Sequence, residues 1–166
     1  MAALHTWLLA FSTLLLSIRT VAVSGRSCLG SQRSILLQLK SSLDFDPFSS
    51  TKLVKWNKST DCCSWEGVSC EDGCVIDLNL RNEGIFGGLD NSSILFNLQR
   101  LKSLDLSFNI FNSPIPSRIA NLINLQYINL SDAGFVGQIP IEISHLRSLV
   151  TLDLSNLFTV KKQLIC

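Results

Sequence analysis

The cysteines are the residues of this sequence with the most distinctive chemistry. There are six: Cys28, Cys62, Cys63, Cys70, Cys74 and Cys166. The middle four of this series could bind zinc as thiolates, but their spacings lack the paired C-x2-C knuckles that zinc sites favour, and no histidine lies nearby. In a secreted chain, cysteines pair as disulfides instead. We therefore favour disulfides over a metal site.

Catalysis would need acids or a histidine gathered at a cleft. Asp105 and Asp153 occupy equivalent places in two similar segments, about 10 Å apart if those segments stack as strands. That separation is close to the carboxylate spacing of an inverting glycosidase. However, Asn129 lies between the two acids, no segment supplies a cleft, and His145 sits at a segment boundary, where it is most simply a surface residue. We expect no enzyme activity, no cofactor and no metal.

Residues 1–24 have the pattern of a secretory signal peptide. An apolar run extends from Trp7 to Ile18, and Ala22-Val23-Ser24 places small residues at a cleavage site. The alternative is a short N-terminal membrane anchor, although the run is too short to span a bilayer. Cleavage would remove Arg19 and no acidic residue, so the remaining basic and acidic residues balance. We therefore expect a secreted chain with no nucleic-acid partner and no transmembrane helix.

The elements that would position these residues are short repeats rich in leucine. The motif L-x-x-L-x-x-L-x-L-x-x-N starts at Leu98 and returns in altered form at Leu122 and Leu146. A motif of this kind with a period of about 20–29 residues marks a leucine-rich-repeat solenoid. We expect an α/β fold with short parallel strands on its concave face. The expected divisions are a cap at 25–74, an irregular first repeat at 75–97, repeats at 98–121 and 122–145, and an incomplete repeat with a tail at 146–166.

A cap without repeats should precede the solenoid and cover its apolar end. Residues 34–43 place Ile35, Leu36, Leu39 and Leu43 on one helical stripe, before Pro47 ends the helix. The first strand is predicted at 75–80, where Val75, Leu78 and Leu80 occupy the apolar repeat positions. Of the positions where the motif requires asparagine, only Asn109 is filled, and Glu83 and Ala133 stand at two of the others.

The cap and the repeats resemble those of plant leucine-rich-repeat proteins. Cys28, a following amphipathic helix, Trp56-Asn57 and Cys62-Cys63-x-Trp65-x-Gly67-Val68-x-Cys70 match the plant-type N-terminal cap. Gly137-Gln-Ile139-Pro140 matches the plant-specific repeat tail, and Ser113-Pro-Ile115-Pro116 matches it with serine for glycine. The double cysteine is most similar to the extracellular start of receptor-like proteins in plant immunity, including the Verticillium-wilt-resistance type.

This resemblance implies a particular disulfide pairing, Cys28 with Cys62 and Cys63 with Cys70. Cys74 and Cys166 would then remain unpaired. A bond between them would have to link opposite ends of the solenoid, roughly 14 Å apart for strands spaced about 4.8 Å. A disulfide needs α-carbons within about 7 Å.

The outward positions of the strands are the usual binding surface of this fold. We expect them to be exposed, with Phe108 and Tyr127 as the best anchors because aromatic side chains dominate interface energetics. For any one position, a solvated side chain is the simpler interpretation. The candidate residues are Lys102, Asp105, Ser107, Phe108, Gln126, Tyr127, Asn129, Ser131, Asp132, Thr151, Asp153 and Ser155. Sequons at Asn57, Asn91 and Asn129 are candidate glycosylation sites in a secreted chain.

The resemblance implies an extracellular interaction module that binds a protein or peptide ligand, with a co-receptor as a further partner. It would lie in the apoplast, and family members are usually anchored at the plasma membrane. The repeat motif fails after Leu154, so we expect a truncated chain. One alternative is a secreted inhibitor of cell-wall-degrading enzymes, similar to polygalacturonase-inhibiting proteins. A further alternative is a non-functional truncated product.

Overall fold

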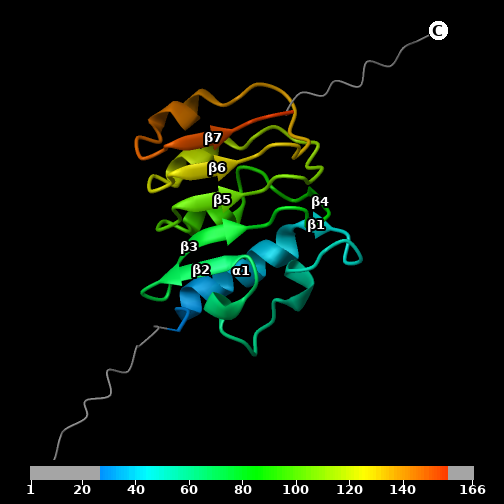
Figure 1. Ribbon diagram of the computed structural model, residues 1–166, viewed down its shortest axis with the longest axis vertical. Helices are drawn as coiled ribbons and strands as arrows, with labels where there is room; N and C mark the ends of the chain where they lie inside the picture. Colours follow the sequence, from blue (N-terminus) through cyan, green and yellow to red (C-terminus); the bar gives the residue numbers. More distant parts are fainter. Residues whose placement is uncertain (1–26, 157–166) are drawn as a thin grey trace, which may run out of the picture.

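Each repeat contributes one short strand, and the strands stack in parallel into the main sheet (Figure 1). The computed structural model describes residues 27–156, so the expected signal peptide, Cys166 and the end of the last repeat lie outside the described residues. The parallel strands are β3 (Cys74–Asn79), β5 (Ser103–Asp105), β6 (Tyr127–Asn129) and β7 (Thr151–Asp153). The predicted first strand at 75–80 is confirmed, displaced by one residue.

Each parallel strand points a leucine or isoleucine side chain into the solenoid. Leu78, Leu104 and Ile128 are partners in the parallel register, and each is fully buried. Their outward neighbours alternate with them because successive side chains of a strand point to opposite faces. Leu152 holds the same place in β7, the last described strand, and is 37% exposed.

The N-terminal cap is built around helix α1 (Gly30–Ser42). Leu36, Leu39 and Leu43 of the predicted stripe are buried against the solenoid. The cap also holds two short 3-10 helices, η1 (Leu53–Lys55) and η2 (Cys62–Ser64). The helical cap is therefore confirmed.

The cap also contributes a strand that the sequence did not predict. Strand β2 (Val68–Glu71) pairs antiparallel with β3, so the main sheet has the order β2-β3-β5-β6-β7. An unpaired edge of β3 would leave main-chain donors and acceptors open to another chain. Strand β2 satisfies them, which joins the cap to the first repeat through hydrogen bonds as well as through apolar packing.

Short 3-10 helices stack behind the sheet, one from each coil: η3 (Ile94–Asn97), η4 (Ser117–Asn121) and η5 (Ile141–His145). A second, two-stranded sheet pairs β1 (Asp44–Phe45) of the cap with β4 (Ile85–Gly87). Phe111 and Phe135, at equivalent places in successive repeats, stack with ring centroids 4.6 Å apart. Among residues 27–156, no helix is long and apolar enough to cross a bilayer.

The asparagine position of the repeat connects neighbouring coils, as predicted for Asn109. Its Nδ2 donates to the main-chain carbonyls of Leu80, Leu106 and Ser107. Its Oδ1 accepts from the main-chain N–H groups of Glu83 and Ile85 in the preceding coil. One buried amide thus satisfies main-chain groups that would otherwise have no partner.

Glu83 fills the asparagine position of the preceding coil and joins that coil to the cap. Its side chain is fully buried, and the carboxylate accepts hydrogen bonds from the hydroxyls of Ser50 and Thr51 and from the main-chain N–H groups of Lys52 and Leu53. The Lys52 ammonium lies 3.9 Å away. The sequence showed only that asparagine was missing here. The structure shows an acid in the same inward position, with the cap as its partner.

Candidate functional site

Four of the predicted concave-face residues are buried, so the expectation that they would be exposed is wrong. Asp105, Ser107, Asn129 and Ser131 are 9%, 0%, 7% and 6% exposed. They lie at the ends of β5 and β6, where neighbouring coils cover them. As buried groups they stabilise the strand ends and cannot contact a ligand directly.

The four buried residues take part in a turn that recurs in each repeat. Asp105 Oδ1 accepts from the Ser107 main-chain N–H at 2.9 Å and from the Ser107 hydroxyl at 2.6 Å. Asn129 and Ser131 make the same pair of bonds. Aspartate and asparagine commonly bond the backbone two residues on in this way. The recurring Asp/Asn-x-Ser pattern in the sequence indicates this turn, so these residues have a structural role and the prediction that they bind a ligand is wrong.

The third copy of the turn lies at the end of β7. Asp153 Oδ1 accepts from the main-chain N–H and the hydroxyl of Ser155. The hydroxyl bond, with the main-chain bond second, lowers the pKa of Asp153. Asp153 therefore stays ionised, and it is only partly buried.

The remaining candidates form the accessible part of the concave face. Phe108, Gln126, Thr151 and Ser155 are exposed, and Lys102, Tyr127, Asp132 and Asp153 are half-buried. The cap adds an ion pair to this face, because Lys102 Nζ lies 2.6 Å from Glu71 Oε2 at the end of β2. This hydrogen bond and the lysine charge lower the pKa of Glu71.

Arg81 belongs to the same surface, although it is not among the residues predicted from the sequence. Its guanidinium carbon lies 3.9 Å from the centroid of the Phe108 ring, and Nη1 donates to the Ser107 hydroxyl at 3.0 Å. Arg81 stands in its coil where serine stands in the next two. The position of Arg81 beside Ser107 could therefore have been read from the repeat alignment.

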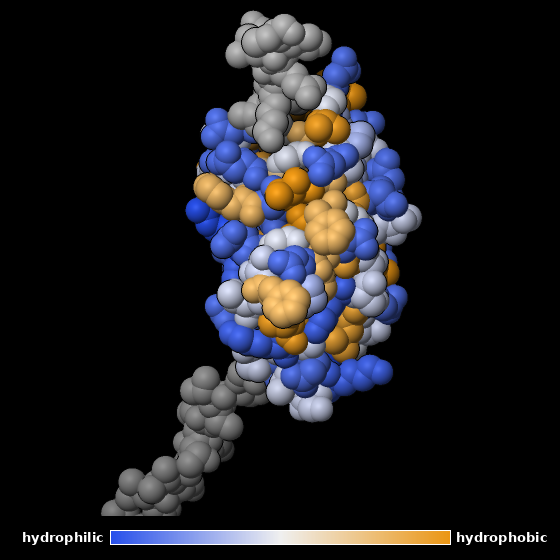
Figure 2. Space-filling model, turned by 90° about the vertical axis from the view of Figure 1, so that its right-hand side faces the viewer, coloured by the Kyte–Doolittle hydropathy of each residue, from blue (hydrophilic) through white to orange (hydrophobic). Residues whose placement is uncertain are grey.

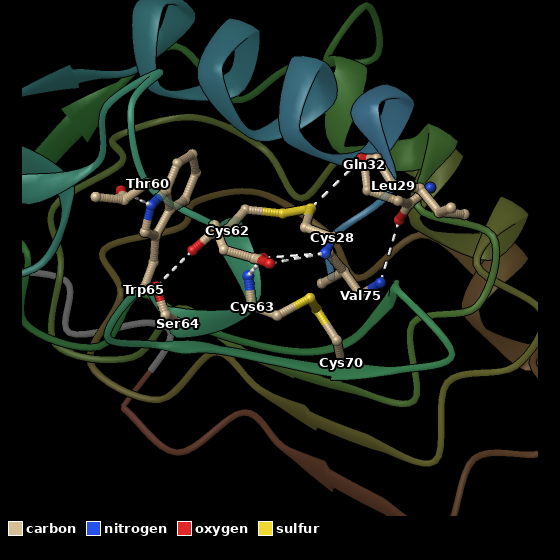
Figure 3. Close-up of a disulfide and its surroundings, with 11 residues drawn as sticks. Cys28, Leu29, Gln32, Thr60, Cys62, Cys63, Ser64, Trp65, Cys70 and Val75 are labelled. Carbon is tan, nitrogen blue, oxygen red and sulfur yellow. Dashed lines mark hydrogen bonds between the residues drawn. A yellow bond between two sulfur atoms is a disulfide. The ribbon is translucent and has the colours of Figure 1, made fainter. Parts of the chain in front are cut away.

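The cap disulfides join Cys28 to Cys62 and Cys63 to Cys70, as the resemblance implied (Figure 3). In both bonds the α-carbons are 5.5 Å apart. Asp61 lies between them, and its carboxylate accepts from the main-chain N–H groups of Cys63 and Cys28. These two bonds lower the pKa of Asp61.

The disulfides also decide between the two roles considered for the cysteines. Ligand atoms of Cys28, Asp61, Cys62 and Cys63 lie within 4.8 Å of one another, a geometry that could hold a metal. All three of these cysteines are disulfide-bonded, however, so they offer no thiolate, the form that binds zinc. Within residues 27–156, Cys74 is the unpaired cysteine and is half-buried. Cys166 lies outside the described residues.

Removal of the long-loop disulfide should destabilise the protein more than removal of the short-loop one. The Cys28–Cys62 bond closes a sequence separation of 34, and Cys63–Cys70 one of 7. Loop-closure entropy predicts losses of between about 3 and 4 kcal/mol for C28A/C62A and about 2 kcal/mol for C63A/C70A. Guanidinium unfolding of the two double variants measures both losses. Equal losses, or the reverse order, would contradict this expectation.

The three sequons differ in how available their asparagines are. Asn57 and Asn91 are exposed. The amide oxygen of Asn91 accepts from the main-chain N–H of Arg118, and its Nδ2, the atom that carries a glycan, makes no hydrogen bond within the described residues. Asn129 is 7% exposed and bonds Ser131, so a glycan there is incompatible with the folded sheet.

We therefore expect the secreted protein to carry glycans at Asn57 and Asn91 and none at Asn129. Chains modified at Asn129 should fail to fold and be retained in the cell. Mass spectrometry of peptides treated with a glycosidase tests this distribution. The matched control is N129D, because aspartate fills the same turn at positions 105 and 153. N129D should be secreted normally, and glycan at Asn129 in secreted wild-type protein would refute the expectation.

Comparisons with known proteins agree with this architecture. Residues 29–71 match the leucine rich repeat N-terminal domain, and residues 100–122 and 124–146 match the leucine rich repeat. Receptor-like protein 6 of Arabidopsis thaliana is 37% identical over an alignment 172 positions long, which covers 93% of this chain and 17% of the relative. The Receptor-like protein Cf-9 homolog of Solanum lycopersicum is 50% identical over 64 residues, which cover 37% of this chain and 8% of the relative. This chain thus spans less than a fifth of the length of either relative.

Solved plant structures superpose on this fold as well. A plant ice-binding protein superposes with a TM-score of 0.67 at 26% identity, covering 78% of this chain and 41% of that one. The ectodomain of the Arabidopsis receptor kinase HAESA, solved in complex with a peptide hormone ligand, superposes with a TM-score of 0.61 at 29% identity. That match covers 73% of this chain and 20% of the ectodomain.

The capped parallel sheet with its partly exposed concave face defines a leucine-rich-repeat solenoid similar to the ectodomains of plant receptors, and the matches indicate no enzyme family. The chain belongs to the leucine-rich-repeat family and is related to the N-terminal part of plant receptor-like proteins.

Proposed function

We propose that this chain is an extracellular interaction module that binds a protein or peptide ligand through its concave face, as part of the ligand-sensing region of a plant immune receptor-like protein. One observation carries the proposal. The accessible concave residues include the exposed aromatic Phe108 and the half-buried Tyr127, set among polar and charged side chains. Interfaces favour such aromatic anchors with a polar surround.

The relatives support the extracellular setting of this proposal. The sequence relatives are receptor-like proteins, and the HAESA ectodomain was solved with a peptide ligand. The cap disulfides fit an oxidising compartment. A stable interface buries about 800 Å² on each partner, from about 20–30 residues. Since the accessible concave positions are fewer than that, we propose that a co-receptor or further repeats supply the rest of the surface.

The test uses the full chain, secreted by plant cells and purified from the medium. A phage library of random 12-residue peptides is selected on the immobilised protein, and the affinity of an enriched peptide is measured by biolayer interferometry. Y127A should weaken binding about tenfold or more, the effect of removing an interface anchor. F86A is the matched control, because Phe86 is an exposed aromatic residue on β4, outside the main sheet.

Two results would contradict the proposal. In the first, no peptide is enriched over an uncoated surface. In the second, enriched peptides bind Y127A and F86A as well as they bind the wild-type protein. Failure of the chain to reach the medium would contradict its extracellular location.

A further inference from the structure

Phe108 has a backbone conformation that does not suit its side chain. Asn82, Phe108, Asp132 and Asn156 occupy equivalent places just after the strands, and their φ angles are 54°, 57°, 52° and 56°. Asparagine and aspartate tolerate this left-handed region, whereas a bulky side chain there is an outlier. The repeat therefore requires a left-handed residue at this place, and only the coil of β5 fills it with an aromatic side chain.

Burial of the ring in the core does not explain this choice. Phe108 is 45% exposed, whereas Phe111 of the same coil is 2% exposed and stacks on its neighbour in the next repeat. Unfavourable backbone conformations persist where the surrounding structure imposes them, and they cluster at binding sites. Here the main-chain bond from Phe108 N–H to the Ser131 carbonyl, at 3.0 Å, belongs to the regular ladder between coils and holds the backbone in place.

Arg81 fixes the orientation of the ring. Its guanidinium lies 3.9 Å from the ring centroid and donates to the Ser107 hydroxyl, which in turn donates to the buried Asp105 carboxylate at 2.6 Å. These two hydrogen bonds hold the Arg81 side chain in place through Ser107 and Asp105. No carboxylate among residues 27–156 forms an ion pair with Arg81, so its remaining N–H groups are available to a ligand.

Further hydrophobic side chains lie near the ends of the parallel strands. Ile110 is 61% exposed two residues after Phe108, and Val136 is 48% exposed in the next coil. Figure 2 shows hydrophobic patches among polar ones on the side of the molecule toward which these strands run. The exposed ring of Phe108 therefore has one exposed apolar residue, Ile110, two positions away in the chain. Against it lies the Arg81 guanidinium, which forms no ion pair within residues 27–156.

We propose that Phe108 and Arg81 form one anchor, which binds a peptide segment carrying an aromatic side chain next to a carboxylate. The aromatic side chain packs on the exposed part of the Phe108 ring and on the apolar surface near it. The carboxylate pairs with the open guanidinium N–H groups, a geometry that arginine presents in a planar fork. The proposal rests on the proposed function, because it specifies the chemistry of the ligand for the same face.

The direct test uses a defined probe, the peptide acetyl-Gly-Phe-Asp-Gly-amide, titrated to millimolar concentration into 15N-labelled protein. The NMR signals of the Arg81 side chain and the Phe108 amide should shift in a saturable way. Acetyl-Gly-Phe-Asn-Gly-amide, which lacks the charge, should bind at least about threefold more weakly. Added salt should weaken the charged probe more than the neutral one, because salt screens exposed charges.

Two variants separate binding from stability. F108N places a side chain that tolerates the left-handed backbone at this position, so its melting temperature should stay within about 5 °C of wild type while the probe no longer binds. R81Q keeps a donor for Ser107 and loses the charge, so it should lose the preference for the Asp probe over the Asn probe. F48N is the matched control, because Phe48 is fully exposed in the cap, and it should bind both probes as wild type does.

The outcomes distinguish this inference from the function on which it rests. Unchanged probe binding by F108N and R81Q, or a loss of cooperative unfolding in F108N, would overturn the anchor. If peptides selected from the library depend on Tyr127 and remain insensitive to F108N and R81Q, the anchor fails and the interaction module stands. If no peptide is enriched at all, the proposed function fails as well.

Discussion

Replacing Asn109 with alanine should cost about 4–5 kcal/mol of the free energy of unfolding. Its amide satisfies two main-chain N–H groups and three carbonyls across two coils, at 2.9 to 3.2 Å. Each buried group left without a partner costs about 1–3 kcal/mol, and groups that share one side chain do not add in full. Because native stability is about 5–15 kcal/mol, this is a large fraction of the total.

Guanidinium unfolding followed by circular dichroism measures the loss. N109D should also destabilise the protein, because it keeps the acceptor and replaces the donor with a buried charge beside three carbonyls. N97A is the control, since Asn97 is exposed and its side chain makes no hydrogen bond within the described residues. N97A should stay within about 0.5 kcal/mol of wild type. A loss below about 1 kcal/mol in N109A would show that water replaces the amide.

Replacing Glu83 with alanine should cost a similar amount, about 4–5 kcal/mol, and should loosen the cap from the first coil. The carboxylate is fully buried, and Oε2 alone accepts from Ser50 Oγ at 2.6 Å and from the Lys52 and Leu53 main-chain N–H groups at 3.0 and 3.1 Å. Removal of one member of a buried charged network costs about 3–5 kcal/mol, because its partners remain buried and unpaired.

The sharpest readout for this variant is hydrogen exchange at individual amides. In E83A the Lys52 and Leu53 amides should exchange faster relative to the amides of β5 and β6. E83Q should lose about half as much stability, because its one carbonyl oxygen can still accept from those amides. E66A is the surface control, since the Glu66 and Lys55 side chains are 57% and 66% exposed and such pairs contribute about 0–1 kcal/mol. Equal losses in E83A and E66A would contradict the structural role of Glu83.

Asn109 and Glu83 both fill the asparagine position of the repeat in successive coils. The sequence predicted the structural role of Asn109 and not that of Glu83. The motif identified Asn109 as an inward residue because asparagine there is diagnostic of the repeat. Glu83 broke the motif, and the bonds that make an acid suitable come from residues 50–53, far away in the chain. No local pattern shows such a pairing, because it exists only once the cap is placed against the first coil.

On the concave face, too, one property could be predicted from the sequence and another could not. Leu104 and Ile128 could be placed inward from their period alone, and both are fully buried. Asp105 and Asn129 could be placed outward by the same reasoning, and they are outward, yet the coils pack closely enough to bury them. The direction of a side chain follows from strand geometry, whereas its exposure depends on its neighbours in other coils.

The sequence by itself determined the solenoid, because leucines at a fixed period can be buried only by stacking each coil on the next. Only the tertiary structure decided the antiparallel strand of the cap, the burial of Glu83, the burial of half of the outward positions of β5 and β6, and the contact of Arg81 with Phe108. The physical reason is the range of the interactions. The leucine repeat is a local pattern that can be recognised along the chain. The contacts of Glu83 and Arg81, in contrast, join side chains that come close together only when the coils stack.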